Sequence, residues 1–255
     1  MRLETLTSPE VRALPIDKLV VLAPLGSFEQ HGAHLPLTTD TDIVTMIANA
    51  VEATLSEQVL CLPCVWLGHS THHMKFPGTL DVKQMHYIAL IEDLCASLLS
   101  MGARKILLLN GHGGNDIPVR AALREVKSAS GDRADLHVMY AAYWMLATQS
   151  IKQIRESEMG GVGHACEMET SLMLHLHPGK VRTDLARRDG PKFESPYRKV
   201  DMQLAKPVYS VNEFHEISES GVIGHPDLAT AVKGARFFEA IVKDVTSFVR
   251  DFLTW

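Results

Sequence analysis

The stretch that decides the fold begins at Leu19 with the apolar run LVVLA and continues through residues 24–42 as PLGSFEQHGAHLPLTTDTD. An apolar run without alternation is typical of a strand that is covered on both faces. The residues after it combine Gly, Pro and ionisable side chains, which indicates a loop. From about Thr41 the apolar positions recur at intervals of three and four, which predicts an amphipathic helix. A strand, a polar loop and a helix are therefore expected in direct succession.

This order recurs along the rest of the chain. Apolar runs predict further strands at 59–66, 105–110 and 136–140, and helical patterns lie at 82–101, after 116, at 144–156, near 167–174 and up to 252. Alternating strands and helices are typical of a mostly parallel sheet with helices on both faces. We therefore predict one α/β domain over residues 1–255. Residues 180–226 show no regular pattern, and Asp227 is expected to cap the final helix.

Composition excludes several classes of protein. The chain has 255 residues and a net charge of −5, whereas a general nucleic-acid binder needs an excess of basic residues. Four cysteines are too few for a disulfide framework in a chain of this length. The N-terminus carries no apolar signal region, and no stretch approaches the length of a transmembrane helix. We expect a cytoplasmic enzyme that binds neither nucleic acid nor membrane.

Side chains that can bind metals gather in three places, two of them after predicted strands and one at a helix start. Ligands bind at the carboxyl ends of strands in open α/β sheets, and zinc, manganese and ferrous iron accept imidazole nitrogen and carboxylate oxygen. The candidates are Glu29, His31 and Asp40 after the first strand, His112 after the third, and His164, Glu167 and Glu169 at the helix start. Their joint placement favours a metal centre.

Each of these residues taken singly has a simpler interpretation. Asp40 is suited to capping a helix, and His164 is suited to the start of one. The run GHGGN at 111–115 is also compatible with an anion-binding nest at a helix N-terminus. However, the chain lacks the Lys-Ser/Thr pair of a P-loop and the spaced glycines of a dinucleotide fingerprint. The nest is therefore the weaker hypothesis.

Five segments, in this order, resemble the creatininase (creatinine amidohydrolase) family. They are LGSFEQHGAHLPLTTDT at 25–41, FPGT at 76–79, NGHGGN at 110–115, HACEMETS at 164–171 and GVIGHPDLAT at 221–230. The resemblance covers the chain from about residue 10 to residue 250. It implies a three-layer α/β/α domain, a homohexamer, and a binuclear metal centre that hydrolyses a C–N bond, typically in a cyclic amide or formamide.

The resemblance also implies roles for individual residues. By position, Glu29 and His112 bind one metal, His31 binds the other, and Asp40 bridges the two. Creatininase itself has a metal-binding Glu where this chain has Gly114. We expect Glu169, or failing that Glu167, to replace it. The implied cofactors are two divalent ions per chain, Zn²⁺ first, with Mn²⁺ or Fe²⁺ as alternatives.

His164 and Glu169 are the catalytic candidates, with His164 shuttling a proton or steadying the tetrahedral oxyanion. Two departures concern the substrate: the aromatic residue that follows the third-motif His in creatininase is Gly113 here, and its Trp-Asp pair falls in the Gly160–Gly161 region. We therefore expect no creatinine hydrolysis.

The remaining ionisable residues near these motifs are assigned lesser roles. His34 is expected to support the site indirectly, and Asp42 to occupy the first turn of a helix, where the dipole favours an acid. His69, His72 and His73 follow the second strand; they could line the mouth of the pocket, but for His72 and His73 we expect solvated positions.

The predicted function is hydrolysis of a C–N bond in a small cyclic amide, formamide or related polar substrate by a metal-activated water. One alternative is a metal-dependent hydrolase or lyase acting on a non-amide carbonyl, such as a cyclic ketone or an ester. A second alternative is a metal-binding scaffold without catalysis, which the glycine at position 114 favours.

Overall fold

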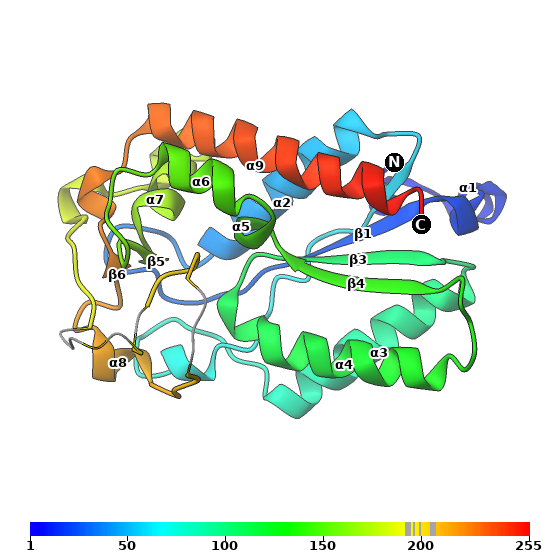
Figure 1. The fold of residues 1–255 in the computed structure, drawn as a ribbon, viewed down its shortest axis with the longest axis horizontal. Helices are drawn as coiled ribbons and strands as arrows, with labels where there is room; N and C mark the ends of the chain where they lie inside the picture. Colours follow the sequence, from blue (N-terminus) through cyan, green and yellow to red (C-terminus); the bar gives the residue numbers. More distant parts are fainter. Residues whose placement is uncertain (192–194, 196, 199, 205–207) are drawn as a thin grey trace.

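The computed structural model describes residues 1–191, 195, 197–198, 200–204 and 208–255. Within this part of the chain, four parallel strands form the central sheet in the order β2-β1-β3-β4 (Figure 1). The strands are β1 (Val20–Leu25), β2 (Val59–Cys61), β3 (Lys105–Asn110) and β4 (His137–Ala142). Every residue of β1 is buried, which explains its unbroken apolar sequence, since helices cover the sheet on both sides.

The helices form two layers, one on each face of the sheet (Figure 1). Two hydrophobic clusters, divided by the alternating side chains of β1, fill the spaces between the sheet and these layers. One layer contains α2 (Thr39–Thr54), α5 (Tyr143–Leu146), α6 (Thr148–Ile154), α7 (Glu167–Leu176) and α9 (Ala231–Phe252), and the other contains α3 (Gln84–Ser100) and α4 (Asp116–Ala129). A short helix, α1 (Ser8–Ala13), precedes β1. The predicted three-layer α/β/α architecture is confirmed.

Three predicted boundaries differ from the structure. β2 ends at Cys61 rather than 66, because Pro63 has no N–H to donate to a neighbouring strand. The helix predicted at 144–156 is broken at Ala147 into α5 and α6. The final helix is capped by the Thr230 side chain, which accepts from the Lys233 N–H at 3.1 Å. The predicted cap, Asp227, lies instead in a short 3-10 turn and pairs with Arg188.

A second, two-stranded sheet of β5 (Val162–His164) and β6 (Ile223–Gly224) lies beyond the carboxyl edge of the main sheet. Between β5 and α7, Ala165 adopts a left-handed φ of 50°, which is rare for a residue with a Cβ. This sharp turn lets α7 begin within three residues of the strand's end. Both β5 and the start of α7 therefore lie at the carboxyl edge of the sheet. The short helix α8 (Phe214–Ile217) lies at the same edge. In the described part of the chain, no helix is both long and apolar enough to cross a membrane.

Candidate metal centre

Asp40 joins two histidines that come from different loops. It lies in the first turn of α2, is almost fully buried, and receives a hydrogen bond from Ser27 Oγ at 2.9 Å. Its Oδ1 lies 3.0 Å from Nε2 of His31, and its Oδ2 lies 3.1 Å from Nδ1 of His112. One carboxylate therefore has an imidazole nitrogen beside each oxygen, an arrangement suited to a ligand shared between two ions.

Glu29 is the second carboxylate of the site and carries an unsatisfied atom. Its Oε1 lies 3.2 Å from Nδ1 of His112, 3.3 Å from Nε2 of His73 and 3.7 Å from Nδ1 of His164. Its Oε2 is buried and has no hydrogen-bond partner among the described residues. Burying a carboxylate oxygen without a donor or a cation is costly. The residues present therefore fit a bound cation, which would satisfy this oxygen.

Main-chain carbonyls fix the tautomers of three histidines. Nδ1 of His31 lies 3.2 Å from the Glu29 carbonyl, Nε2 of His112 lies 2.9 Å from the His69 carbonyl, and Nε2 of His164 lies 2.7 Å from the Gln30 carbonyl. A carbonyl only accepts, so each of these ring nitrogens carries the proton. The opposite nitrogen of each ring faces the carboxylates. This orientation by a second hydrogen bond is characteristic of metal-binding histidines.

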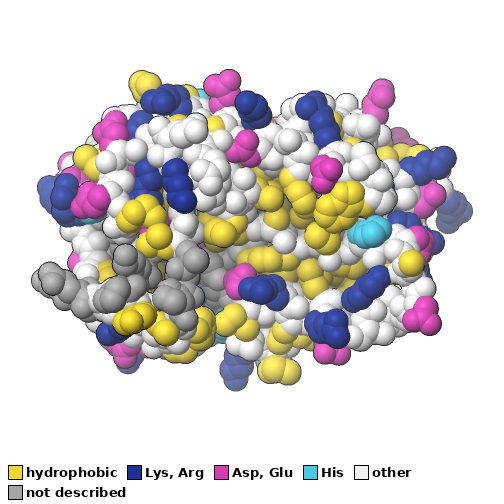
Figure 2. All heavy atoms as spheres, in the orientation of Figure 1, with side chains coloured by type: hydrophobic (Ala, Val, Ile, Leu, Met, Phe, Trp, Pro, Cys, Tyr) yellow, Lys and Arg dark blue, Asp and Glu magenta, His cyan; other side chains and the backbone are white. Residues whose placement is uncertain are grey.

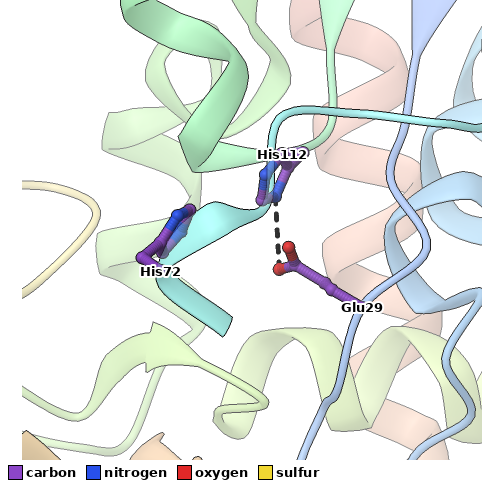
Figure 3. A group of neighbouring side chains, drawn as sticks. All are labelled: Glu29, His72 and His112. Atoms are coloured by element: carbon purple, nitrogen blue, oxygen red, sulfur yellow. Dashed lines mark ion pairs between the residues drawn. The ribbon is translucent and has the colours of Figure 1, made fainter. Parts of the chain in front are cut away.

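Three groups of side chains among the described residues bring their ligand atoms within 4.8 Å of one another. They are Glu29, His72 and His112 (Figure 3), Glu29, His31 and His164, and His31, Asp40 and Glu169. The last group contains the carboxylate expected to replace the one missing at Gly114. The structure thus brings together all the predicted ligands, from the loops after β1 and β3 and from the first turns of α2 and α7.

Glu167 does not join these residues. Its carboxylate accepts from Nζ of Lys233 at 2.7 Å and from the N–H groups of Glu156 and Ser157 at 3.0 and 2.9 Å. Glu169, two residues further along α7, is buried beside the site and accepts from the Cys166 N–H at 3.3 Å. Of the two carboxylates considered from the sequence, the geometry therefore favours Glu169.

The ionisable side chains of the site shift one another's pKa values. Burial disfavours protonated His31, but Asp40 and then Glu169 outweigh it and raise the pKa of His31 to about 9. Burial likewise opposes ionisation of Glu29, yet His112 and His73 hold its pKa well below the usual range. Burial raises the pKa of Glu169 to about 7, although His31 opposes the rise. The pocket therefore holds protons that a cation replaces when it binds.

The expectation that His72 and His73 are solvated is wrong. His73 is 1% exposed; its Nδ1 lies 2.8 Å from Nε2 of Gln30, and its ring packs on Phe214 with centroids 3.9 Å apart. His72 is partly buried between His112 and Phe214. Burial lowers the pKa of His72 to about 4 and that of His73 well below its usual value, so both are neutral. The sequence did offer one indication that these two histidines belong to the site: they follow β2, the strand that pairs with β1.

Two side chains of the opening loop support the site from outside it. Nε2 of His34 lies 2.9 Å from Oγ1 of Thr170 and so ties the loop to α7. Asp42 lies in the first turn of α2 and pairs with Lys180 at 2.8 Å. Sequence reasoning missed Ser27 and Gln30, because neutral side chains of these types do not indicate a metal ligand. Ser27 donates to Asp40, and the Gln30 side chain contacts His73 and His164 and donates to the Gly221 carbonyl.

A wide cleft of about 1130 Å³ opens over the site. Glu29, Asp40, His112, His164 and Glu169 all contribute to its lining. Its outer part is formed by the exposed side chains of Tyr197, Tyr209 and Val211. The carboxylates and imidazoles are therefore reachable by a molecule from solvent.

Comparison with known proteins gives a consistent result. The family model described as creatininase, creatinine amidohydrolase, matches residues 4–249. The chain is similar to the mycofactocin precursor peptide peptidase of Mycobacterium tuberculosis (34% identity, covering 91% of this chain and 84% of that protein) and to the creatinine amidohydrolase of Pseudomonas putida (25%, 91% and 89%). A solved structure titled "Creatininase Mn" aligns over 98% of this chain and 97% of its own at 26% identity, with a TM-score of 0.81. The chain belongs to the creatininase family and is a hydrolase.

Proposed function

We propose that this hydrolase cleaves an amide C–N bond at a centre of two divalent metal ions. The observation that carries the proposal is the position of Asp40 between His31 and His112, beside the orphaned Oε2 of Glu29. Relatives named as a creatinine amidohydrolase and as a peptide peptidase support the bond type. A non-amide carbonyl is the alternative, since one relative of 28% identity, from Thermotoga maritima, is a 3-dehydro-scyllo-inosose hydrolase.

The two metal positions follow from the side-chain groups. Glu29 and His112 would hold one ion, His31 and Glu169 the other, and Asp40 would contribute to both. Bound divalent metals polarise a substrate carbonyl and lower the pKa of water. The mixed oxygen and nitrogen ligands suit Zn²⁺, Mn²⁺ or Fe²⁺, and solved creatininases include a form titled with Mn and one described as Zn-Zn.

His164 is proposed to move the proton. The Gln30 carbonyl fixes a proton on its Nε2, so its Nδ1, which faces Glu29, is the nitrogen that can accept another. Burial, followed by His31, lowers the pKa of His164 to about 3, so the imidazole would hold that proton only briefly before passing it on. In hydrolysis, the water oxygen bonds to the carbonyl carbon, Nδ1 takes the water proton, and the proton passes to the leaving nitrogen as the C–N bond breaks. This tautomer favours proton transfer over the alternative role of donating to an oxyanion, because the donor nitrogen points away from Glu29.

The cleft favours a second candidate substrate, a peptide, beside the small cyclic amide or formamide predicted from sequence. Its volume of about 1130 Å³ exceeds the roughly 300–1,000 Å³ usual for small-molecule sites. A Cβ at Gly113 would meet no atom of the described residues within 4 Å, so their side chains leave the wall beside His112 open. The exposed aromatic rings of Tyr197 and Tyr209 offer apolar contact to an extended substrate.

A substrate panel tests the proposed function. Protein loaded with Zn²⁺, Mn²⁺ or Fe²⁺ would be assayed against cyclic amides, formamides, short peptides, esters and cyclic ketones, with the folded Glu29→Gln variant as control. We expect turnover of at least one amide class and its loss in the variant. Turnover confined to esters or ketones, or a wild-type protein that binds no metal, would contradict the proposal.

We also propose that the chain forms one domain and assembles into a homo-oligomer, a hexamer by analogy with its family. Hydrophobic side chains lie between α9 and α4, over the edge strand β4 (Figure 2), and most β4 residues are only partly buried. An unpaired apolar sheet edge is usually covered in the native assembly. Light scattering coupled to gel filtration measures the oligomer mass directly.

A further inference from the structure

We propose that His72 is an additional metal ligand, which completes the coordination of the ion held by Glu29 and His112. The inference rests on the proposed metal centre and assigns a residue that neither the family motifs nor the sequence pattern placed there. It depends on three features: the ligand atoms near His72, the space above Gly114, and the attachment of the turn that carries His72.

The first feature is the convergence of the side chains. One nitrogen of His72 lies within 4.8 Å of ligand atoms of both Glu29 and His112. In Figure 3 the carboxylate of Glu29 is directed at His112, and the ring of His72 lies beside them. The rings of His72 and His112 are nearly parallel, with centroids 5.8 Å apart and an interplanar angle of 13°. Three donors from three separate segments thus surround one position, which is what a closed metal site requires.

The second feature is the space above Gly114, where creatininase carries a metal-binding Glu. A Cβ on Gly114 would lie 2.7 Å from Cε1 of His72 and 2.2 Å from the His69 carbonyl oxygen. The ring of His72 and the main chain of its turn therefore occupy the space that a side chain at 114 needs. The loop after β2 therefore fills the space beside His112 that a side chain at 114 would need, and it places an imidazole there.

The third feature is that the turn at Thr71–His73 is held from both sides. Asp81 accepts from the Ser70 N–H and from Oγ1 of Thr71, each at 2.7 Å. On the other side, Oδ1 of Asn115 accepts from the His69 N–H at 3.1 Å. Phe214 packs on the ring of His72, with centroids 5.4 Å apart. These contacts fix His72 before an ion binds, as expected for a ligand on a preformed site.

Metal binding tests the inference without reference to turnover. The wild type, His72→Ala and His72→Gln would be dialysed against graded chelator and their metal content measured, and Co²⁺-loaded samples would be compared by absorption spectroscopy and X-ray absorption. We expect the wild type to hold two ions and each variant to lose affinity for one of them by about 10- to 100-fold. The Co²⁺ sample should lose one nitrogen ligand. His86→Ala, an exposed histidine on α3, is the matched control and should change nothing.

His72→Gln keeps most of the side-chain volume, so it retains the packing against Phe214 if His72→Ala does not fold. Two ions bound with wild-type affinity and an unchanged Co²⁺ spectrum in both variants would overturn the inference and leave the proposed function standing. A wild-type protein that binds no ion would instead remove the proposed function itself. A changed KM with unchanged metal content would assign His72 to substrate contact and would likewise refute the ligand role.

Discussion

Oδ1 of Asp40 lies 3.0 Å from Nε2 of His31, although His31 lies in the middle of the loop after β1 and Asp40 in the first turn of α2. The loop closes on itself because the Glu29 N–H donates to the Leu37 carbonyl at 3.0 Å. This closure brings the first turn of α2 back over Glu29 and His31. The contact between Asp40 and His31 is therefore a property of the loop's own folding, which then receives His112 and Glu169 from elsewhere.

Asp40→Asn should weaken both metal positions at once. The amide keeps the volume and the contact with Ser27, but it removes the charge and one of the two acceptor oxygens that face His31 and His112. We expect metal content to fall by more than half and amide hydrolysis to fall by at least about 100-fold. Elemental analysis of the dialysed variant checks the first expectation. Full loading with two ions would contradict the bridging role.

Glu169→Gln and Glu167→Gln should separate metal binding from stability. Glu169 lies with His31 and Asp40, so its variant should lose one ion while the fold remains stable. Glu167 instead pairs with Lys233 inside the fold, and breaking a buried pair costs about 3–5 kcal/mol. The Glu167 variant should therefore unfold at lower denaturant concentration yet bind two ions when folded. Denaturant titration and metal analysis of both variants measure these effects. A Glu167 variant that loses an ion, together with a Glu169 variant that binds two, would contradict the prediction.

Gly114→Ala and Gly113→Ala form a matched pair of adjacent substitutions. At 114 the new methyl group would lie 2.2 Å from the His69 carbonyl, which would push the histidine-bearing turn away and cost about 1–3 kcal/mol. At 113 the methyl group meets no atom of the described part of the chain within 4 Å, so stability should change by less than about 1 kcal/mol. Thermal unfolding with and without metal measures both. Equal effects at the two positions would show that the turn is not packed against Gly114.

Metal uptake should release protons and should weaken as the pH falls. Asp40 and Glu169 raise the pKa of His31 to about 9 against the effect of burial, and Glu29 raises that of His112 well above the usual value. Both imidazoles are protonated at neutral pH in the metal-free protein and must lose a proton to bind an ion. Calorimetry in buffers of different ionisation enthalpy counts the protons. A metal affinity that stays constant between about pH 6 and pH 8 would contradict this coupling.

Creatinine should not be hydrolysed at an enzymatic rate. The positions that hold the creatinine ring in creatininase are Gly113 and the Gly160–Gly161 region here. Gly113 lines the cleft and has no atom of the described residues within 4 Å of its missing side chain, whereas neither Gly160 nor Gly161 lines the cleft. A small ring would therefore lack side-chain contacts from these positions. Purified protein with both ions bound is the sample to assay, with creatinine depletion as the readout. Turnover comparable to that of an amide substrate would refute the expectation.

The sequence predicted most of the architecture because strands and helices can be recognised from the hydrophobic pattern within each segment. The strands predicted at 19–23 and 105–110 are built on unbroken apolar runs, and the helices between them repeat at the helical period. Boundaries set by single residues were harder to predict. Thr230 caps α9 instead of Asp227, because the turn around Pro226 uses Asp227 before the helix begins.

The sequence by itself determined the candidate metal-ligand side chains, since Glu29, His31, Asp40 and His112 follow buried strands whose carboxyl ends share one edge of a parallel sheet. Only the tertiary structure favoured Glu169 over Glu167 as a candidate ligand, because neighbouring positions in one helical turn point to different surroundings, and Lys233 lies beside only one of them. It also placed His72 and His73 inside the site. The sequence of a polar loop does not reveal whether water or another segment of the chain will cover it. Here Phe214 of α8 covers the loop, and α8 lies about 140 residues further along the chain.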